Sequence, residues 1–121
     1  MIVSGDIILI RFPFTALSQT KVRPALVITR TKDKYKDLVI CAISSVVPDK
    51  VGERELLISK TEKWFNQTGL RVNSVVKVDR LATLREMDVI TKIGNCPSSF
   101  WKKFAKSFCD LTKSRSHPGN K

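Results

Sequence analysis

The chain has 121 residues, of which 42% are hydrophobic, and this is long enough for one domain with a buried core. The chain contains 22 Lys and Arg residues against 11 Asp and Glu, which gives a formal net charge of +11. A charge of this sign attracts polyanions, so the expected partner is first a nucleic acid, second an acidic protein and third an anionic membrane surface. No stretch approaches the roughly 18 apolar residues of a membrane span, and the N-terminus lacks the pattern of a secretion signal, so we expect a cytoplasmic protein outside the membrane.

Six short runs of apolar and β-branched residues predict β-strands. The expected strands cover residues 7–12, 24–29, 38–43, 55–58, 73–79 and 88–93. The first run is almost wholly apolar and is therefore expected to be buried on both faces. Since the connections between the first three strands are too short for helical crossovers, a doubly wound parallel sheet is excluded.

One short helix is predicted between the fourth and fifth strands. Ser59-Lys60-Thr61-Glu62 has the capping-box pattern, in which a serine caps the helix and a glutamate follows three residues later. The helix is expected to run to about Gln67, with Gly69 as its left-handed stop. Trp64 and Phe65 supply its buried side.

A second helix is predicted after Pro97, with Ser98 or Ser99 as its cap. Its aromatic and aliphatic residues recur at helical spacing and predict a buried face, while its lysines take the other face. The apolar positions are Phe100, Trp101, Phe104, Phe108 and Leu111. Residues 113–121 contain no apolar side chain and are predicted to form a disordered basic tail, so the domain is expected to cover residues 1–112.

These elements predict an α+β fold, a small barrel of five to seven strands with a short inserted helix and a C-terminal helix. Cys41, Cys96 and Cys109 are far apart in the chain, and the one histidine, His117, lies in the tail. Because a zinc site needs four ligands at close spacing, we expect no metal or other cofactor, and reduced, mostly buried thiols.

Arg23 is the first candidate for chemistry. It stands directly before Pro24 and the apolar run 25–28, so a rigid strand holds it where that strand meets the preceding loop. A guanidinium matches phosphate and can stabilise charge that develops on a phosphoryl oxygen. An ordinary surface arginine at a strand start is the more common case, and the local sequence leaves both interpretations open.

Two further pairs of residues could act on a phosphate. Ser44 and Ser45 end the third predicted strand, where their hydroxyls can donate to phosphate or ribose oxygens, although a plain turn is more common. Lys77 and Asp79 are two apart on a predicted strand and so project to the same face. They form either an acid–base pair or part of a cross-strand ion pair without function.

In their order and spacing, these segments resemble the PemK/MazF family of toxins from bacterial toxin–antitoxin pairs, over about residues 3–112. The matching segments are Gly5-Asp6, Arg23-Pro24-Ala25-Leu26-Val27-Ile28, Ile43-Ser44-Ser45 and Ser74-Val75-Val76-Lys77-Val78-Asp79, and Phe12-Pro13-Phe14-Thr15 is similar to the PemK-like branch. The resemblance implies an SH3-like barrel that is usually a homodimer. It also implies a cognate antitoxin encoded beside the toxin. Because what binds phosphates also binds carboxylates, we expect an acidic, extended C-terminal segment of this partner to occupy the groove around Arg23.

The activity implied by the resemblance is metal-independent, sequence-selective cleavage of single-stranded RNA, which arrests growth. The ribose 2′-hydroxyl attacks the adjacent phosphate and leaves a 2′,3′-cyclic phosphate and a 5′-hydroxyl. By the same resemblance, Arg23 stabilises the transition state and is a candidate to protonate the leaving group. Ser44 contacts the scissile phosphate, and Lys77 and Asp79 match an acid–base pair. The nucleic-acid contacts expected in addition, mainly to RNA, come from Gln19, Lys21, Ser45, Arg71 and Arg80.

The loop before Arg23 departs from the family pattern. The segment Leu17-Ser18-Gln19-Thr20-Lys21 lacks the glutamate of well-known members and the histidine that precedes it in some, and only Gln19 persists. Lys77 stands in place of an arginine, which keeps the charge but loses the bidentate fork. These differences motivate a second hypothesis, a barrel that binds RNA or another partner without cutting it. A third hypothesis treats the basic surface as the docking face for an acidic peptide.

Overall fold

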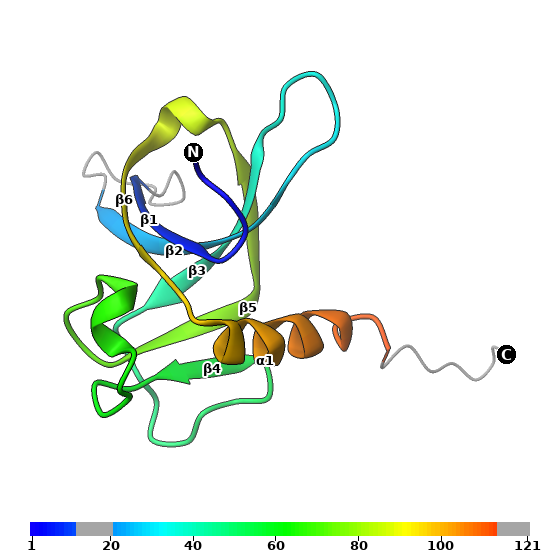
Figure 1. The fold of residues 1–121 in the computed structure, drawn as a ribbon. Coiled ribbons are helices and arrows are strands. Elements are labelled where there is room, and N and C mark those ends of the chain that lie inside the picture. Colours follow the sequence, from blue (N-terminus) through cyan, green and yellow to red (C-terminus); the bar gives the residue numbers. More distant parts are fainter. Residues whose placement is uncertain (12–20, 114–121) are drawn as a thin grey trace, which may run out of the picture.

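The computed structural model describes residues 1–11 and 21–113, which form six strands, one α-helix and two 3-10 helices (Figure 1). The strands are β1 (Asp6–Arg11), β2 (Val22–Arg30), β3 (Leu38–Ser44), β4 (Glu55–Ile58), β5 (Ser74–Leu84) and β6 (Val89–Asn95). The helices are η1 (Phe65–Thr68), η2 (Glu86–Asp88) and α1 (Ser98–Cys109). Every predicted strand is present, although β5 extends five residues beyond the predicted end at Asp79. Phe12, the last residue of the first predicted strand, lies outside the described residues.

The six strands form one antiparallel sheet in the order β4-β5-β3-β2-β1-β6. Among the described residues, the edge strands β4 and β6 do not pair with each other, so the sheet is not closed into a barrel. The predicted α+β class with a C-terminal helix agrees with this architecture, whereas the SH3-like barrel is not confirmed. η1 lies against β6 instead, because Gly69 and Gly94 allow the two backbones to approach closely.

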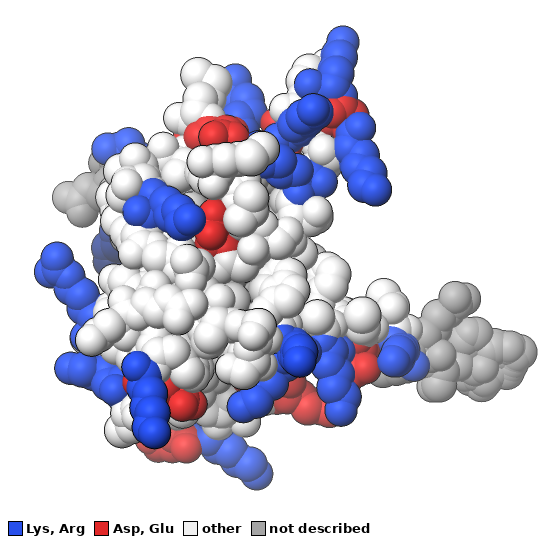
Figure 2. All heavy atoms as spheres, in the orientation of Figure 1, with Lys and Arg blue, Asp and Glu red and all other residues white. Residues whose placement is uncertain are grey.

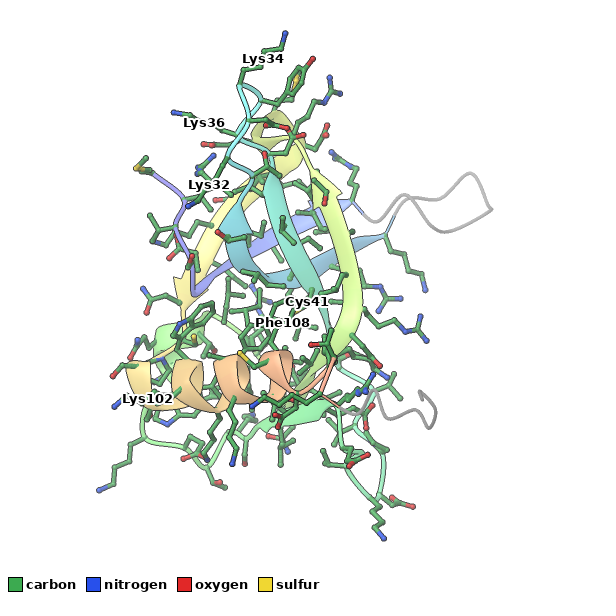
Figure 3. All side chains as sticks on the ribbon, turned by 90° about the vertical axis from the view of Figure 1, so that its right-hand side faces the viewer. Lys32, Lys34, Lys36, Cys41, Lys102 and Phe108 are labelled. Atoms are coloured by element: carbon green, nitrogen blue, oxygen red, sulfur yellow. The ribbon has the colours of Figure 1, made fainter. Side chains whose placement is uncertain are left out.

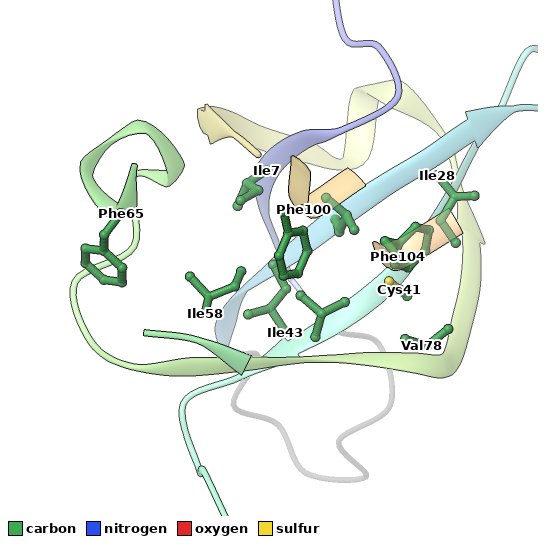
Figure 4. Close-up of a cluster of buried hydrophobic side chains, with 11 residues drawn as sticks. Ile7, Ile28, Cys41, Ile43, Ile58, Phe65, Val78, Phe100 and Phe104 are labelled. Carbon is green, nitrogen blue, oxygen red and sulfur yellow. The ribbon is translucent and has the colours of Figure 1, made fainter. Parts of the chain in front are cut away.

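Both faces of the central strands are buried, as the apolar first strand predicted. One cluster, on the face covered by α1, includes Ile7, Leu26 and Phe104 (Figure 4). A second cluster, on the opposite face, includes Ile8, Ala25 and Ile40. Neighbouring residues of β1 and of β2 thus enter different clusters, because successive side chains of a strand point to opposite faces.

The proline of β2 lies inside the strand and not at its start. Pro24 is opposite Leu9 of β1, while the ladder between β2 and β3 begins one residue later, at Ala25. The missing N–H of Pro24 therefore interrupts no bond of the β2–β3 ladder, which is how a proline is accommodated in this sheet.

The predicted helix from Ser59 to Gln67 is wrong. The Ser59 hydroxyl accepts a hydrogen bond from the Thr61 N–H at 3.2 Å, and the Lys60 N–H donates to the Asn73 side chain at 2.7 Å. These local bonds replace the capping box, because a serine that bonds the backbone two residues on favours a turn over a helix. Only η1 forms, and it ends at Gly69 in the left-handed conformation (φ 75°), as predicted.

The C-terminal helix begins at Ser98 and its cap is Pro97, so the predicted serine cap is wrong. Neither serine makes a capping hydrogen bond, and the Trp101 N–H donates to the Pro97 carbonyl at 3.0 Å. The predicted apolar face is confirmed: Phe100 and Phe104 are buried, and Trp101, Phe108 and Leu111 pack against the same cluster. The predicted tail lies outside the described residues from residue 114 onward.

The Gly5-Asp6 segment has a structural role. Gly5 has a φ of 90°, and the buried Asp6 carboxylate accepts the Val3 N–H at 2.8 Å and pairs with Lys92 of β6 at 3.2 Å. The segment therefore fixes the N-terminal turn against β6. None of the described helices is long and apolar enough to cross a membrane.

The three cysteines differ in burial, and none of them is in a disulfide. Cys41 is buried and Cys96 is partly buried, whereas Cys109 is exposed, contrary to the expectation of mostly buried thiols. Burial raises the pKa of the Cys41 thiol to about 12 and that of Cys96 to about 11. Both thiols are therefore protonated at neutral pH.

The close approach of η1 and β6 gives a prediction for stability. Replacing Gly69 by Ala strains the left-handed backbone and drives a methyl group into the Ile93 carbonyl, so we expect a loss of more than about 1 kcal/mol. Urea unfolding of the Gly69→Ala protein measures this loss. Gly52→Ala is the control, because its new methyl group meets only the flexible Glu55 side chain. Equal stability of the two variants would contradict the packing described.

Candidate functional site

An open groove of about 600 Å³ lies where β2, β3 and β5 come together. We name it the Arg23 groove. Its lining comprises Arg23, Ala42, Ile43, Ser44, Val46, Lys77, Asp79, Arg80, Leu81 and Ala82. All four residues predicted to carry chemistry therefore line one groove, and Arg80, a predicted RNA contact, lines it with them.

An irregularity in β5 lies at three of these residues. Ile43 of β3 pairs with Val76, but Cys41 pairs with Leu81, so residues 77–80 of β5 stand opposite the single residue Ala42. We name residues 77–80 the β5 insertion. In a regular strand Lys77 and Asp79 would share a face and Arg80 would point to the other. Extra residues in one strand re-aim their side chains, and here Arg80 lines the groove together with Lys77 and Asp79.

Arg23 is held on the opposite side of the groove by regular β-structure. It pairs with Ile10 of β1 and precedes the ladder between β2 and β3, which starts at Ala25. The residue is partly buried, and the buried run from Ala25 to Ile28 anchors it. None of the ion pairs among the described residues involves Arg23.

Ser44 forms the turn that was one of the two interpretations of its sequence position. Its hydroxyl oxygen accepts the Val46 N–H at 3.1 Å, which forms a turn at the end of β3. Because a hydroxyl has one proton of its own, Ser44 can still donate to an anion in the groove. Ser45 is exposed and is not part of the groove lining.

Lys77 and Asp79 line the same groove, but each is paired with a residue at or directly before the start of β4. The Lys77 ammonium lies 3.0 Å from the Glu55 carboxylate, and the Asp79 carboxylate lies 3.9 Å from the Arg54 guanidinium. Glu55 is the first residue of β4 and faces Lys77 in the β4–β5 ladder, whereas Arg54 precedes the strand and its carbonyl accepts the Val78 N–H at 2.9 Å. The entry into β4 therefore holds both residues of the predicted acid–base pair.

Glu55 is the residue that sequence reasoning missed. The Gly52 N–H donates to its carboxylate at 2.8 Å, and this bond, followed by the Lys77 ammonium, lowers the pKa of Glu55 below its ordinary value. The carboxylate therefore stays charged beside Lys77. Its importance depends on the pairing of β4 with β5, which no local pattern in the sequence indicates.

Two other predicted RNA contacts, Lys21 and Arg71, do not join the groove. Lys21 is exposed beside the start of β2, and Arg71 is exposed in the connection before β5. Neither is part of the groove lining. Gln19 lies outside the described residues, as does the rest of the altered loop up to Thr20. The described part of the chain contains no group of three His, Cys, Asp or Glu side chains placed to hold a metal ion.

Fold and groove together define a basic protein built on an antiparallel sheet, with guanidinium, ammonium, hydroxyl and carboxylate groups in one open groove. The chain belongs to the family of PemK-like, MazF-like toxins of type II toxin–antitoxin systems, whose model matches residues 4–111. No curated protein sequence matches the chain significantly.

Solved structures of related toxins have the same fold. The Mycobacterium tuberculosis toxin MazF-mt6 is 20% identical, with 89% of this chain and 96% of that chain covered and a TM-score of 0.66. A MazE–MazF structure from Deinococcus radiodurans is 16% identical, covers 93% and 96%, and has a TM-score of 0.69. An endoribonuclease in complex with its cognate antitoxin from a mycobacterial species is 10% identical, covers 97% and 100%, and has a TM-score of 0.68.

The ion pair between Glu55 and Lys77 predicts a pH dependence of stability. Because the pKa of Glu55 is lowered in the folded state, ionised Glu55 stabilises the protein above its ordinary pKa, and this contribution is lost as the pH falls through the lowered value. We expect Glu55→Gln to be less stable than wild type at neutral pH, with the difference shrinking below the ordinary value of 4.5.

Urea unfolding across the acidic range measures this effect, with Glu62→Gln as the control. Glu62 is exposed and takes part in none of the ion pairs of the described residues. A Glu55→Gln difference that stays constant with pH would rule out the ionised pair as its cause.

Proposed function

We propose that this protein is the toxin of a toxin–antitoxin pair and acts as a metal-independent endoribonuclease on single-stranded RNA. The observation that carries the proposal is the meeting of Arg23, Ser44, Lys77 and Asp79 in one open groove of a chain from this toxin family. The net charge of +11 supports it, because a cationic protein attracts RNA and speeds the encounter. The proposal includes the homodimer that is usual in the family.

The proposed reaction uses only groups of the Arg23 groove and the RNA. The Asp79 carboxylate accepts the proton of a ribose 2′-hydroxyl, and the 2′-oxygen forms a bond to the adjacent phosphorus. Arg23 and Ser44 donate to the phosphate oxygens, on which charge develops. The bond to the 5′-oxygen breaks, and the Lys77 ammonium gives that oxygen a proton. The products are a 2′,3′-cyclic phosphate and a 5′-hydroxyl.

The ion pairs place an opposite charge beside each proposed group. The Glu55 carboxylate lies 3.0 Å from the Lys77 ammonium, and the Arg54 guanidinium lies 3.9 Å from the Asp79 carboxylate. Both partners belong to the segment that contains the start of β4, so this segment positions the proposed acid and the proposed base in the groove.

A second function, binding of RNA without cleavage, is favoured by the sequence before Arg23. Residues 17–21 contain no acidic side chain. In addition, the ammonium of Lys77 cannot bind phosphate in the bidentate manner of an arginine guanidinium. RNA affinity that falls steeply with salt, without formation of products, would identify this second function.

Removal of Arg23 gives the direct test of the enzymatic proposal. We expect wild-type protein to cut a long single-stranded RNA in EDTA, and Arg23→Ala to lower the cleavage rate by about 10²–10³-fold, as loss of one oxyanion donor does. Gel mapping of the ends measures both. Arg85→Ala is the matched control, because exposed Arg85 pairs with Asp88 and is not part of the groove lining. Undiminished cleavage by Arg23→Ala would refute the assignment.

The Arg23 groove is also the proposed site of the antitoxin. Two of the structures with this fold contain an antitoxin, and a groove that binds phosphates also binds carboxylates. We propose an antitoxin whose acidic, extended segment covers Arg23. The protein encoded beside this toxin is expected to bind wild type and to suppress cleavage, and Arg23→Ala is expected to weaken that binding about tenfold, the factor that corresponds to 1.4 kcal/mol. Equal affinity for both, measured by calorimetry, would exclude this groove as the site.

A further inference from the structure

A second groove, of about 590 Å³, runs between α1 and the segment that leads into β4. We name it the α1 groove. Its lining contains four cationic and two acidic side chains, with Leu56 and Ser107 between them. The charged residues are Glu53, Arg54, Lys103, Lys106, Asp110 and Lys113. Figure 2 shows blue lysine and arginine side chains along α1, with red carboxylates among them.

The lysines of this groove follow from the spacing of the helix. Residues three and four apart lie on one side of a helix, so Lys103, Lys106 and Asp110 share a face. The opposite face is buried in the core through Phe100 and Phe104. Because the core fixes the rotation of α1, it also fixes the side to which these cations project.

Arg54 connects the α1 groove with the Arg23 groove. It lines the α1 groove, and its guanidinium lies 3.9 Å from the carboxylate of Asp79, which lines the Arg23 groove. Its side chain is 42% exposed, so it is accessible to a ligand. One residue thus lies between the proposed site of cleavage and a row of lysines.

We propose that the α1 groove binds the backbone phosphates of single-stranded RNA next to the cleaved bond. This inference rests on the proposed function and extends its substrate site along α1. Lysine ammonium groups contact phosphates as point charges and distinguish no base, so this contact adds affinity without sequence preference. RNA is the occupant we propose, because the α1 groove continues the Arg23 groove through Arg54 and an RNA strand bound for cleavage extends beyond the cleaved bond.

The consequence is a dependence of affinity on RNA length. An oligonucleotide that fills only the Arg23 groove leaves the α1 groove empty, whereas a longer one contacts both. Each phosphate contact with a single strand changes the slope of log K against log salt by about 0.7. Loss of two lysine contacts should therefore reduce the slope for the long RNA by about 1.4.

The experiment measures binding of 2′-O-methyl RNA, which lacks the attacking hydroxyl, by fluorescence anisotropy. Random-sequence oligomers of about 4 and about 16 nucleotides cover the range of site sizes known for single-strand-binding domains. The test variant is Lys103→Gln/Lys106→Gln. The control, Lys32→Gln/Lys34→Gln, makes the same change in net charge on the β2–β3 connection, away from α1 (Figure 3).

We expect the test variant to bind the long oligomer about tenfold more weakly at low salt, with a reduced salt slope and unchanged affinity for the short oligomer. The control is expected to resemble wild type. Equal losses in both variants would mean that only the overall charge attracts RNA, and no loss in either would mean that α1 does not contact it. Both outcomes overturn the inference. A third outcome would also overturn it: a polyglutamate peptide binds through Lys103 and Lys106, but binding of the long RNA does not depend on these two lysines.

Cleavage of unmodified RNA by wild-type protein is measured in parallel, so that the two proposals fail separately. Length-dependent binding through α1 without any cleavage would overturn the enzymatic function and leave the α1 groove as an RNA site. Cleavage that persists while the two-lysine variant binds like wild type would leave the enzymatic function and overturn the α1 groove.

Discussion

The site depends on one mismatch between two strands. Four residues of β5 stand opposite Ala42 of β3, and the strand bends there. Without this insertion, a regular ladder would continue from Val76, with Lys77 and Asp79 on one face and Arg80 on the other. With the insertion, all three residues line one groove with Arg23. It also joins two parts of the sheet, since β5 pairs with β4 before the bend and with the first half of β3 after it.

The charged groups around the insertion hold one another in place. Glu55 is bound to the Gly52 N–H and to Lys77, while Arg54 faces Asp79. Glu55 begins the short edge strand β4 and Arg54 directly precedes it, so the entry into β4 positions two side chains of the groove. Arg23, in contrast, is held by a strand that is buried behind it and paired on both sides. The groove therefore combines a rigid cation from β2 with charges on β5 that depend on their neighbours.

Local patterns predicted much of the fold. The apolar runs predicted the strands, and the spacing of the aromatic residues predicted the buried face of α1. Arg23 and Ser44 were expected at strand ends because each of them adjoins an apolar run. What failed depended on competing local bonds: Ser59 and Asn73 hold a turn where the capping pattern favoured a helix. The insertion in β5 and the role of Glu55 depend on strand register, which is fixed by contacts between segments distant in the sequence.

The central claim is that Arg23 and the β5 insertion form one catalytic unit. A double-mutant cycle tests it most directly, with cleavage rates of wild type, Arg23→Ala, Asp79→Asn and the protein that carries both changes. Residues that act as a unit give strongly non-additive losses. The account predicts that the double variant is about as slow as the slower single variant. Losses that multiply would show that the two residues act independently, and would contradict it.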